Sequence, residues 1–244
     1  MRLKFYLMSY KIFSLGEDAL TVDFGNEISV KLNIRVLKLA ELLEENAFKG
    51  FVEVVPAYAS VTVFYDVSKV RKNYPEFFTA FDAVESLVKI RLENQNLAQI
   101  SEAKPIEIPV CFDKEFSLDL DFVAAANDCS KQEVIEIFLG EIYRVFMLGF
   151  LPGFSYMGEV SKKIAVPRKK TPRPRVPAGS VGIANRQTGI YSLESPGGWQ
   201  IIGKTPIELF TPNSEVPTFL KPGELVKFYE IDKASFLKLK SENK

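Results

Sequence analysis

The chain has 244 residues, 47% of them hydrophobic, and its 31 basic and 31 acidic side chains balance. This length allows one large or two small domains, and the neutral balance argues against a protein that coats nucleic acid through bulk charge. The absence of histidine excludes a Ser-His-Asp triad, a Cys-His dyad and any His-ligated zinc site, and two cysteines cannot form a structural zinc site.

The sequence also indicates a globular protein that does not enter a membrane. The apolar run over residues 145–154 is too short to span a bilayer and is interrupted by glycine and proline. The N-terminus does not continue into a signal-peptide core, because polar residues arrive by Ser9. We therefore expect a cytoplasmic protein, and the low cysteine content fits that compartment.

The first 94 residues are predicted to form a small α+β domain. Alternation of apolar and polar residues predicts a strand over 20–24, and helical spacing after Ser29, a plausible N-cap, predicts a helix to about residue 46. Two β-rich runs follow over 51–55 and 61–65. Asn73 and Pro75 mark the expected start of a second helix that reaches about residue 94.

A polar segment without periodicity, residues 95–104, is the predicted linker to a second domain over 105–232. That domain is predicted to begin with a strand over 106–112, helices over 117–127 and 130–139, and a strand over 143–148. Ser130 and Glu133 fit a capping box for the second of these helices. The final residues, 233–244, are interpreted as a frayed basic tail.

Short β-prone runs separated by glycine or proline turns dominate the rest of the second domain. They cover residues 181–184, 189–193, 200–202, 207–210 and 225–230. No crossover helices separate them, which favours a β-barrel or sandwich over a parallel sheet.

The stretch from residue 149 to 206 has an unusual composition. It holds nine of the 14 glycines and seven of the 14 prolines, so much of its backbone has either extra freedom or a fixed φ. Residues 160–193 carry eight basic side chains and no acidic one, whereas residues 105–159 carry ten acidic and three basic side chains. We therefore expect an anionic ligand to bind in this stretch.

Four cations of the proline-rich segment 167–177 are the main candidates for binding that anion: Arg168, Lys170, Arg173 and Arg175. Prolines stiffen the segment and hold the cationic groups close together, and guanidinium groups suit bidentate binding of carboxylate or phosphate. A small anionic substrate is the favoured ligand, and a solvated loop is the alternative. Nucleic acid is a weaker interpretation, because no aromatic residues alternate with the basic ones.

Polar and glycine residues downstream complete the predicted binding set. Gly179 and Ser180 belong to a loop whose backbone N–H groups could converge on an anion, or which simply turns into a strand. Ser180, Gln187, Thr188 and Tyr191 are candidates for orienting a substrate. The Gly-Lys-Thr sequence at 203–205 lacks the upstream glycine of a phosphate-binding P-loop.

A further set of residues is predicted to line a pocket or an interface: Phe150, Pro152, Phe154, Gly197, Gly198, Trp199 and Thr205. The phenylalanines around the Pro-Gly turn fit either a core or an exposed pocket wall. Trp199, the only tryptophan, is either a core anchor or a platform at a pocket mouth, and its glycine neighbours favour the platform. The sequence assigns no catalytic residue and no metal ligand.

Several of these segments together resemble the KipI/PxpB family, also called allophanate hydrolase subunit 1-like. The specific segments are Gly149-Phe-Leu-Pro-Gly-Phe-Ser-Tyr-Met157, Pro172-Arg-Pro-Arg-Val-Pro-Ala-Gly-Ser-Val181, Gln187-Thr-Gly-Ile-Tyr191, Ser195-Pro-Gly-Gly-Trp199 and Ile202-Gly-Lys-Thr-Pro206. Looser similarity extends to the start of the chain. Many relatives carry a histidine where this chain has Phe138, which is a departure from the family pattern.

The resemblance implies an α+β N-terminal domain followed by a cyclophilin-like β-barrel. It implies a subunit of an ATP-dependent 5-oxoprolinase, with a paired barrel subunit (KipA/PxpC-like) and a lactam-hydrolase subunit (PxpA-like) as partners. ATP would then be used by the complex rather than bound by this chain alone. The alternatives that the resemblance leaves open are inhibition of a sensor histidine kinase and a role related to allophanate hydrolase or urea amidolyase.

Overall fold

The computed structural model describes residues 10–93 and 104–242. The chain divides into two units, Met1–Ser101 and Glu102–Lys244, and each has its own hydrophobic core. The predicted linker over residues 95–104 lies outside the described residues except for Lys104. No helix in the described part of the chain is long and apolar enough to cross a membrane.

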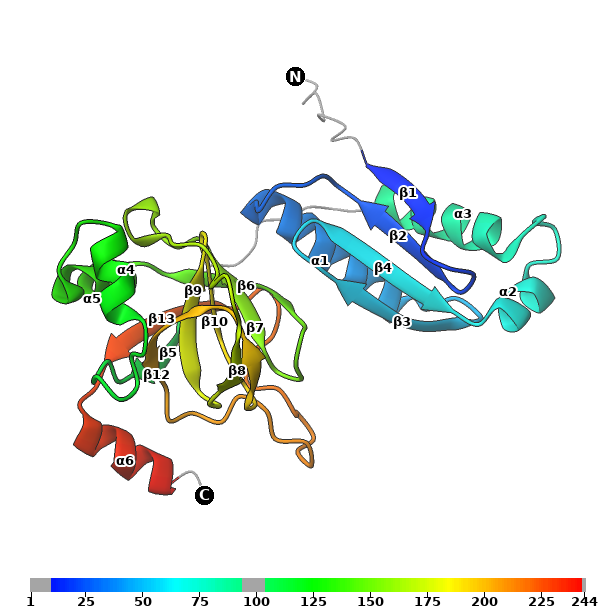
Figure 1. Ribbon diagram of the computed structural model, residues 1–244. Coiled ribbons are helices and arrows are strands. Elements are labelled where there is room, and N and C mark those ends of the chain that lie inside the picture. The colour runs from blue at the N-terminus through cyan, green and yellow to red at the C-terminus, as the bar shows by residue number, and fades with distance from the viewer. Residues whose placement is uncertain (1–9, 94–103, 243–244) are drawn as a thin grey trace. The chain divides into compact units, whose positions relative to one another are not determined.

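The N-terminal unit is a four-stranded antiparallel sheet with helices packed on it. Its strands are β1 (Lys11–Ser14), β2 (Ala19–Asp23), β3 (Phe51–Pro56) and β4 (Ser60–Tyr65), in the order β1-β2-β4-β3. Its helices are α1 (Val30–Glu45), α2 (Val67–Asn73) and α3 (Ala80–Glu93). The apolar stripes of α1 and α3 share one core with the strands, so both helices cover the same face of the sheet (Figure 1). The predicted α+β character of this unit is confirmed.

The helix predicted to start near Asn73 begins only at Ala80, as α3, and a separate helix, α2, precedes it. Local capping interactions define the two helices. Asp66 caps α2 by accepting the Lys69 backbone N–H (2.9 Å), and that helix ends at Asn73. Thr79 and Asp82 then cap α3 reciprocally: Asp82 N–H donates to Thr79 Oγ1 (3.0 Å) and Thr79 N–H donates to Asp82 Oδ2 (2.9 Å). Asn73 therefore ends one helix instead of starting another.

The C-terminal unit is built on a seven-stranded sheet in the order β12-β9-β10-β7-β6-β13-β5. These strands are β5 (Ile106–Val110), β6 (Tyr143–Leu148), β7 (Ser155–Gly158), β9 (Ser180–Ala184), β10 (Gln187–Ile190), β12 (Gln200–Lys204) and β13 (Leu225–Glu230). All neighbours are antiparallel except β13 and β5. A separate ribbon pairs β8 (Arg173–Val176) with β11 (Ser195–Gly197).

Two hydrogen bonds connect the two edge strands of the large sheet, β5 and β12. Cys111 N–H donates to the Lys204 carbonyl oxygen (2.8 Å), and Lys204 N–H donates to the Cys111 carbonyl oxygen (3.0 Å). Cys111 directly follows β5 and Lys204 ends β12, so this contact brings the sheet close to a closed barrel. The predicted barrel is therefore confirmed as a nearly closed, barrel-like sheet.

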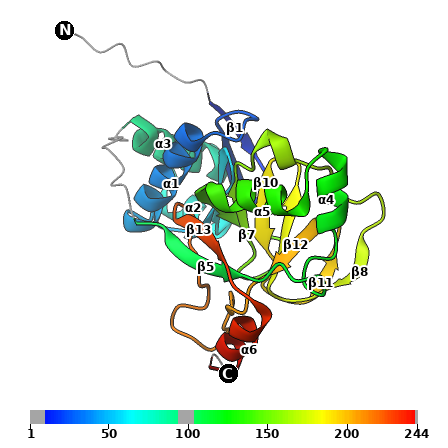
Figure 2. The ribbon, with the colours of Figure 1, turned by 90° about the vertical axis from the view of Figure 1, so that its left-hand side faces the viewer.

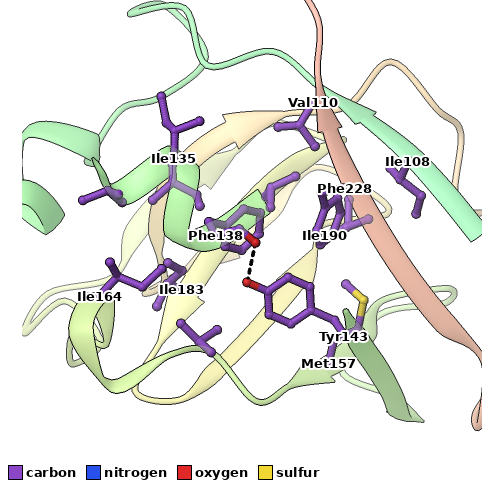
Figure 3. Packing of buried hydrophobic residues seen from close by; sticks show 14 of the residues in the cluster. Ile108, Val110, Ile135, Phe138, Tyr143, Met157, Ile164, Ile183, Ile190 and Phe228 are labelled. Atoms are coloured by element: carbon purple, nitrogen blue, oxygen red, sulfur yellow. Dashed lines mark hydrogen bonds between the residues drawn. The ribbon is translucent and has the colours of Figure 1, made fainter. Parts of the chain in front are cut away.

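Buried aliphatic side chains pack inside the barrel together with the rings of Phe138, Tyr143 and Phe228 (Figure 3). The Phe138 ring lies 5.1 Å from the rings of Tyr143 and Phe228, and Tyr143 Oη donates to the Phe138 carbonyl oxygen (2.8 Å). Phe138 comes from α5 (Lys131–Gly140), which with α4 (Leu120–Ala126) contributes apolar residues to the same core. Phe138, the departure from the family pattern that the resemblance implied, is thus a core residue in this chain.

The residues that were expected to form a frayed tail instead form helix α6 (Lys233–Glu242), which follows β13 (Figure 2). Asp232 starts the helix, because its Oδ1 accepts the Ser235 N–H (2.7 Å) and its carbonyl oxygen accepts the Phe236 N–H (2.9 Å). Phe236 is 2% exposed and its ring lies 4.5 Å from that of Phe116. The sequence prediction missed this helix because the segment is rich in lysine and only Phe236 is buried.

One further expectation for the C-terminal unit was wrong: residues 207–210 do not form a strand, and only an isolated bridge joins Phe210 to Thr218. The helix expected over 117–127 is confirmed as α4, although it begins only at Leu120, with Asp119 as its N-cap. The predicted capping box is confirmed at the start of α5, where Ser130 and Glu133 bind each other's backbone N–H groups.

Candidate functional site

A pocket of about 270 Å³ opens in the C-terminal unit, within the glycine- and proline-rich stretch. It is lined by Phe150, Phe154, Tyr156, Arg168, Pro172, Tyr191, Pro196, Gly197, Gly198 and Trp199. We call this set the aromatic pocket. Its wall is mostly rings and glycine backbone, with one guanidinium group.

Edge-to-face ring contacts organise the pocket around Phe154. The Phe154 ring centroid lies 4.8 Å from Tyr156, 5.2 Å from Tyr191, 5.5 Å from Trp199 and 5.6 Å from Phe150, all in T-shaped geometry. Such contacts fix the ring orientations beyond what burial alone would do. The rings come from three places in the barrel: β7 and the turn before it, the end of β10, and the start of β12.

The turn that carries Phe150 has an unusual backbone. Phe150 has a φ of +69°, in the left-handed region that bulky residues rarely adopt. Its side chain is also 61% exposed, although it is aromatic. Two hydrogen bonds hold this conformation: Leu151 N–H donates to the Gly149 carbonyl oxygen (2.8 Å) and Phe154 N–H to that of Leu151 (3.0 Å). Backbone strain of this kind clusters at functional sites, which supports the pocket as one.

Gly197 allows the pocket wall to close on Tyr191. A Cβ at Gly197 would lie 2.7 Å from Tyr191 Cε1 and 2.8 Å from its Cζ, closer than real Cβ contacts. At Gly198 the nearest heavy atom would be 3.7 Å away, which is an ordinary contact. The packing therefore requires a glycine at the first of these two positions, whereas a Cβ at the second would make only ordinary van der Waals contacts.

Arg168 supplies the positive charge at the pocket. Its guanidinium carbon lies 5.8 Å from the centroid of the Trp199 ring, which is a cation–π distance. Within residues 10–93 and 104–242, neither Arg168 nor the exposed Lys170 forms an ion pair. Burial raises the pKa of Tyr156 and of Tyr191, and the Arg168 charge opposes this rise in both. The two phenols are therefore neutral hydrogen-bonding groups near pH 7.

The other two predicted arginines form ion pairs with the chain's own carboxylates. Arg173 binds Asp119 in bidentate fashion, with Nη1 to Oδ2 at 2.7 Å and Nη2 to Oδ1 at 2.6 Å. Arg175 pairs with Glu194 at 2.6 Å. Of the four predicted cations, only Arg168 lines the pocket.

Asp119 is the most buried carboxylate of this region. Its side chain also accepts hydrogen bonds from the Lys169 ammonium (3.1 Å) and the Ile201 backbone N–H (2.7 Å). Burial raises the pKa of Asp119, but the hydrogen bonds from Arg173, Ile201 and Lys169 outweigh it and the net pKa lies below its usual value. Asp119 therefore stays ionised at neutral pH.

Several predicted site residues lie outside the pocket lining. Thr188 is fully buried, and its Oγ1 donates to the Gly182 carbonyl oxygen (3.0 Å), so it packs inside the barrel. Gln187 lies at the start of β10, at the other end of that strand from Tyr191. Ser180 and Thr205 are buried, and Gly179, with a φ of +83°, packs against the Thr205 backbone. Pro152 and Lys170 are exposed but do not line the cavity.

Tyr156, Pro172, Pro196 and Asp119 were not among the predicted site residues. Tyr156 lies two residues after Phe154, and the two prolines are adjacent in sequence to the predicted residues Arg173 and Gly197. The sequence analysis had therefore identified the segments that carry these three residues, but not the residues themselves. Asp119 gave no local signal, because it precedes its partner Arg173 by 54 residues. Aromatic faces beside one guanidinium group are an arrangement that suits a small, partly apolar anion.

Comparison with known proteins gives matches over nearly the whole chain. Residues 10–220 match the family of the carboxyltransferase domain, subdomain C and D. The chain is 45% identical to a 5-oxoprolinase subunit of Bacillus subtilis (strain 168), over 96% of this chain and 98% of that protein. It is 37% identical to the corresponding 5-oxoprolinase subunit of Escherichia coli O157:H7, over 89% of this chain and 94% of that protein.

The solved structure of TTHA0988 has the same fold, with a TM-score of 0.76 and 35% identity over 88% of this chain. The match covers 40% of the TTHA0988 chain, so this chain spans about two fifths of that protein. Urea amidolyase of Saccharomyces cerevisiae (strain ATCC 204508 / S288c) is a distant relative: it is 26% identical over 92% of this chain, and the match covers 13% of its own length.

Proposed function

This chain belongs to the KipI/PxpB family of 5-oxoprolinase subunits, and from that premise we propose that it is a subunit of an ATP-dependent 5-oxoprolinase. The complex would open the lactam ring of 5-oxoproline and release glutamate. The names of its relatives, which are those of enzyme subunits, support the existence of partner subunits. The aromatic pocket is the substrate site of this proposal.

The observation that carries this assignment is the single guanidinium group beside an aromatic wall. The substrate, 5-oxoproline, is a five-membered lactam with one carboxylate and no ammonium group, so it offers a compact ring with apolar CH₂ groups, one polar amide and one negative charge. Its ring fits against Trp199 and its neighbours, and its carboxylate fits Arg168. The hydroxyl groups of Tyr156 and Tyr191 are the polar side-chain groups of the lining that would contact the lactam amide.

ATP binding is assigned to the complex rather than to this chain alone. The Gly203-Lys204-Thr205 sequence does not form a phosphate-binding loop, since Gly203 and Lys204 lie in β12 and Lys204 N–H is bonded to Cys111. Thr205 is buried, and its Oγ1 accepts the Ile207 N–H (3.2 Å). The partners would be a KipA/PxpC-like barrel subunit and a PxpA-like lactam-hydrolase subunit.

Two finer assignments belong to the same proposal. We assign the barrel to the cyclophilin-like type, for which the nearly closed seven-stranded sheet is the support. We also assign the protein to the cytoplasm, where the free thiols of Cys111 and Cys129 would stay reduced. Inhibition of a sensor histidine kinase and a role related to allophanate hydrolase or urea amidolyase stay predictions from the sequence resemblance.

The test is ATP hydrolysis by the purified chain, alone and mixed with its candidate partner subunits, with and without 5-oxoproline. We expect hydrolysis only in the full mixture and only when 5-oxoproline is present. If folded subunits that associate with one another hydrolyse no ATP in response to 5-oxoproline, the proposed function is wrong.

A further inference from the structure

We propose that Asp119 is the positioning residue of the aromatic pocket: its carboxylate holds the loop of residues 167–177 so that the Arg168 guanidinium stays over the Trp199 ring. The effect of this positioning on substrate binding rests on the proposed function. The positioning itself is a property of the free chain.

One buried carboxylate ties together the two segments that flank the pocket. Asp119 is 5% exposed and accepts four hydrogen bonds. Three come from the loop, through Lys169 and the two Nη atoms of Arg173, and the fourth comes from the backbone of Ile201. Ile201 lies in β12, two residues after Trp199. Asp119 therefore binds both the segment 167–177 and the segment that carries Trp199.

The residues on both sides of Arg168 form further hydrogen bonds that fix its backbone. Lys169 follows Arg168 directly, and its backbone N–H also donates to the Gly198 carbonyl oxygen (2.7 Å). On the other side, the Pro167 carbonyl oxygen accepts Gln200 Nε2 (3.1 Å). Both neighbours of Arg168 are thus bound to the segment around Trp199, while Arg168 itself is exposed and forms the cation–π contact.

Asp119 is itself fixed by its backbone. Its N–H donates to the Ile201 carbonyl oxygen (2.7 Å), and its own carbonyl oxygen accepts the Val123 N–H (2.9 Å) at the start of α4. Leu120 and Val123, which follow it, pack in the barrel core. The carboxylate is therefore a rigid support. Pro172, which lines the pocket next to Arg173, is held by the same support.

Trp199 is the only tryptophan of the chain, so its fluorescence reports on the pocket directly. The experiment compares the wild type, Asp119→Asn, Arg168→Gln and the double variant, all without ligand at pH 7. The readouts are the Trp199 emission maximum and its quenching by acrylamide. Glu194→Gln, which breaks the Arg175 ion pair in the same loop, is the matched control.

We expect Asp119→Asn to shift the Trp199 signal in the same direction as Arg168→Gln, and the double variant to show no further shift. Such non-additivity between the two positions would reveal that Asp119 acts through Arg168. The Glu194→Gln signal should equal that of the wild type. A wild-type signal in Asp119→Asn, or fully additive shifts in the double variant, would overturn the proposal.

Loss of folding is checked by the unfolding transition of each variant. If Asp119→Asn does not fold, Lys169→Gln replaces it, because this change removes one cation from Asp119 and leaves the Arg173 pair intact. Lys169→Gln should then shift the Trp199 signal by a smaller amount than Arg168→Gln does. An unchanged signal in a folded Lys169→Gln variant would count against the proposal.

Binding supplies the second arm of the test. Titration of the same proteins with 5-oxoproline should show a Kd at least about tenfold higher for Asp119→Asn than for the wild type. If the wild type binds no 5-oxoproline, the proposed substrate fails, while the ligand-free fluorescence comparison still decides the role of Asp119. The two failures are therefore distinguishable.

Discussion

At the scale of single residues, neighbouring glycines in the pocket wall have different physical roles. Gly197 lies against the ring of Tyr191, and an added Cβ would have to displace an aromatic side chain that is almost fully buried. Gly198 faces Pro172 at ordinary contact distance. Adding a methyl group to a tightly packed site typically costs about 1–3 kcal/mol. A Cβ at Gly198 would meet its neighbours at ordinary van der Waals distance, so the change there should cost much less.

Gly197→Ala should therefore weaken ligand binding, because the Tyr191 ring would move into the pocket or away from Phe154. We expect the Kd for 5-oxoproline, measured by calorimetric titration, to rise by about tenfold or more. Gly198→Ala is the matched control and should bind within about twofold of the wild type. Equal affinity for the two variants would show that this wall does not contact the ligand.

The ionised state of Asp119 predicts a specific pH dependence of stability. Its folded-state pKa is lowered relative to the unfolded value of about 3.9, because the hydrogen bonds from Arg173, Ile201 and Lys169 outweigh burial. The stabilisation is thus fully present above about pH 5 and is lost as the pH falls through the folded-state pKa.

In urea denaturation, Asp119→Asn should lower the free energy of unfolding by about 3 kcal/mol at pH 7, since it breaks a largely buried ion pair. The difference between wild type and variant should shrink as the pH falls below about 4, where Asp119 of the unfolded wild type takes up a proton, until the folded-state pKa is passed. A difference that stays constant between about pH 7 and about pH 2.5 would show that the charge of Asp119 contributes nothing.

At the scale of elements, the sequence indicated those helices and strands whose signals are local. The capping box of Ser130 and Glu133 predicted the start of α5, and alternation of apolar residues predicted β5. Elements that depend on distant partners were missed. The segment Arg173–Val176 is basic and rich in proline, and it forms a strand only because β11 pairs with it. The helix α6 depends on the burial of Phe236 against Phe116.

Phe236→Ala should therefore release α6 from the barrel. We expect a loss of about 3 kcal/mol in the free energy of unfolding, typical of removing a buried phenylalanine. Leu237→Ala is the control, because Leu237 is adjacent but 53% exposed, and its effect should stay within about 0.5 kcal/mol. Similar losses for both variants would contradict the anchoring role of Phe236.

At the scale of the whole molecule, charge composition marked the segment that contains the candidate site but did not identify the residues that line it. The excess of basic residues over 160–193 pointed to the segment that holds Arg168, and the glycine-rich surroundings of Trp199 pointed to a pocket mouth. Sequence alone does not show which cations are already neutralised. Asp119 and Glu194 occupy Arg173 and Arg175, and this pairing depends on how the barrel brings distant segments together.

The same consideration applies to the polar candidates for substrate contact. Thr188 and Ser180 lie in β10 and β9, and both are buried in the folded unit. Thr188 shares the face of Ile190 toward the barrel core, whereas Ser180 lies on the opposite face of its strand from Val181. A one-dimensional pattern marks them as polar and near the cation cluster, but the direction of each side chain is set by strand pairing. The candidate site is accordingly smaller and more aromatic than the sequence suggested.

The proposed function depends above all on Arg168 binding the substrate of a 5-oxoprolinase complex in the aromatic pocket. We would therefore measure 5-oxoproline-dependent ATP hydrolysis by the complex reconstituted with wild type, Arg168→Gln or Arg186→Gln. Arg186 lies in the same basic segment but pairs with Glu159 away from the pocket lining. We predict that Arg168→Gln lowers kcat/KM for 5-oxoproline by about tenfold or more and that Arg186→Gln leaves it unchanged. Wild-type kcat/KM in the Arg168→Gln complex would show that Arg168 does not bind the substrate.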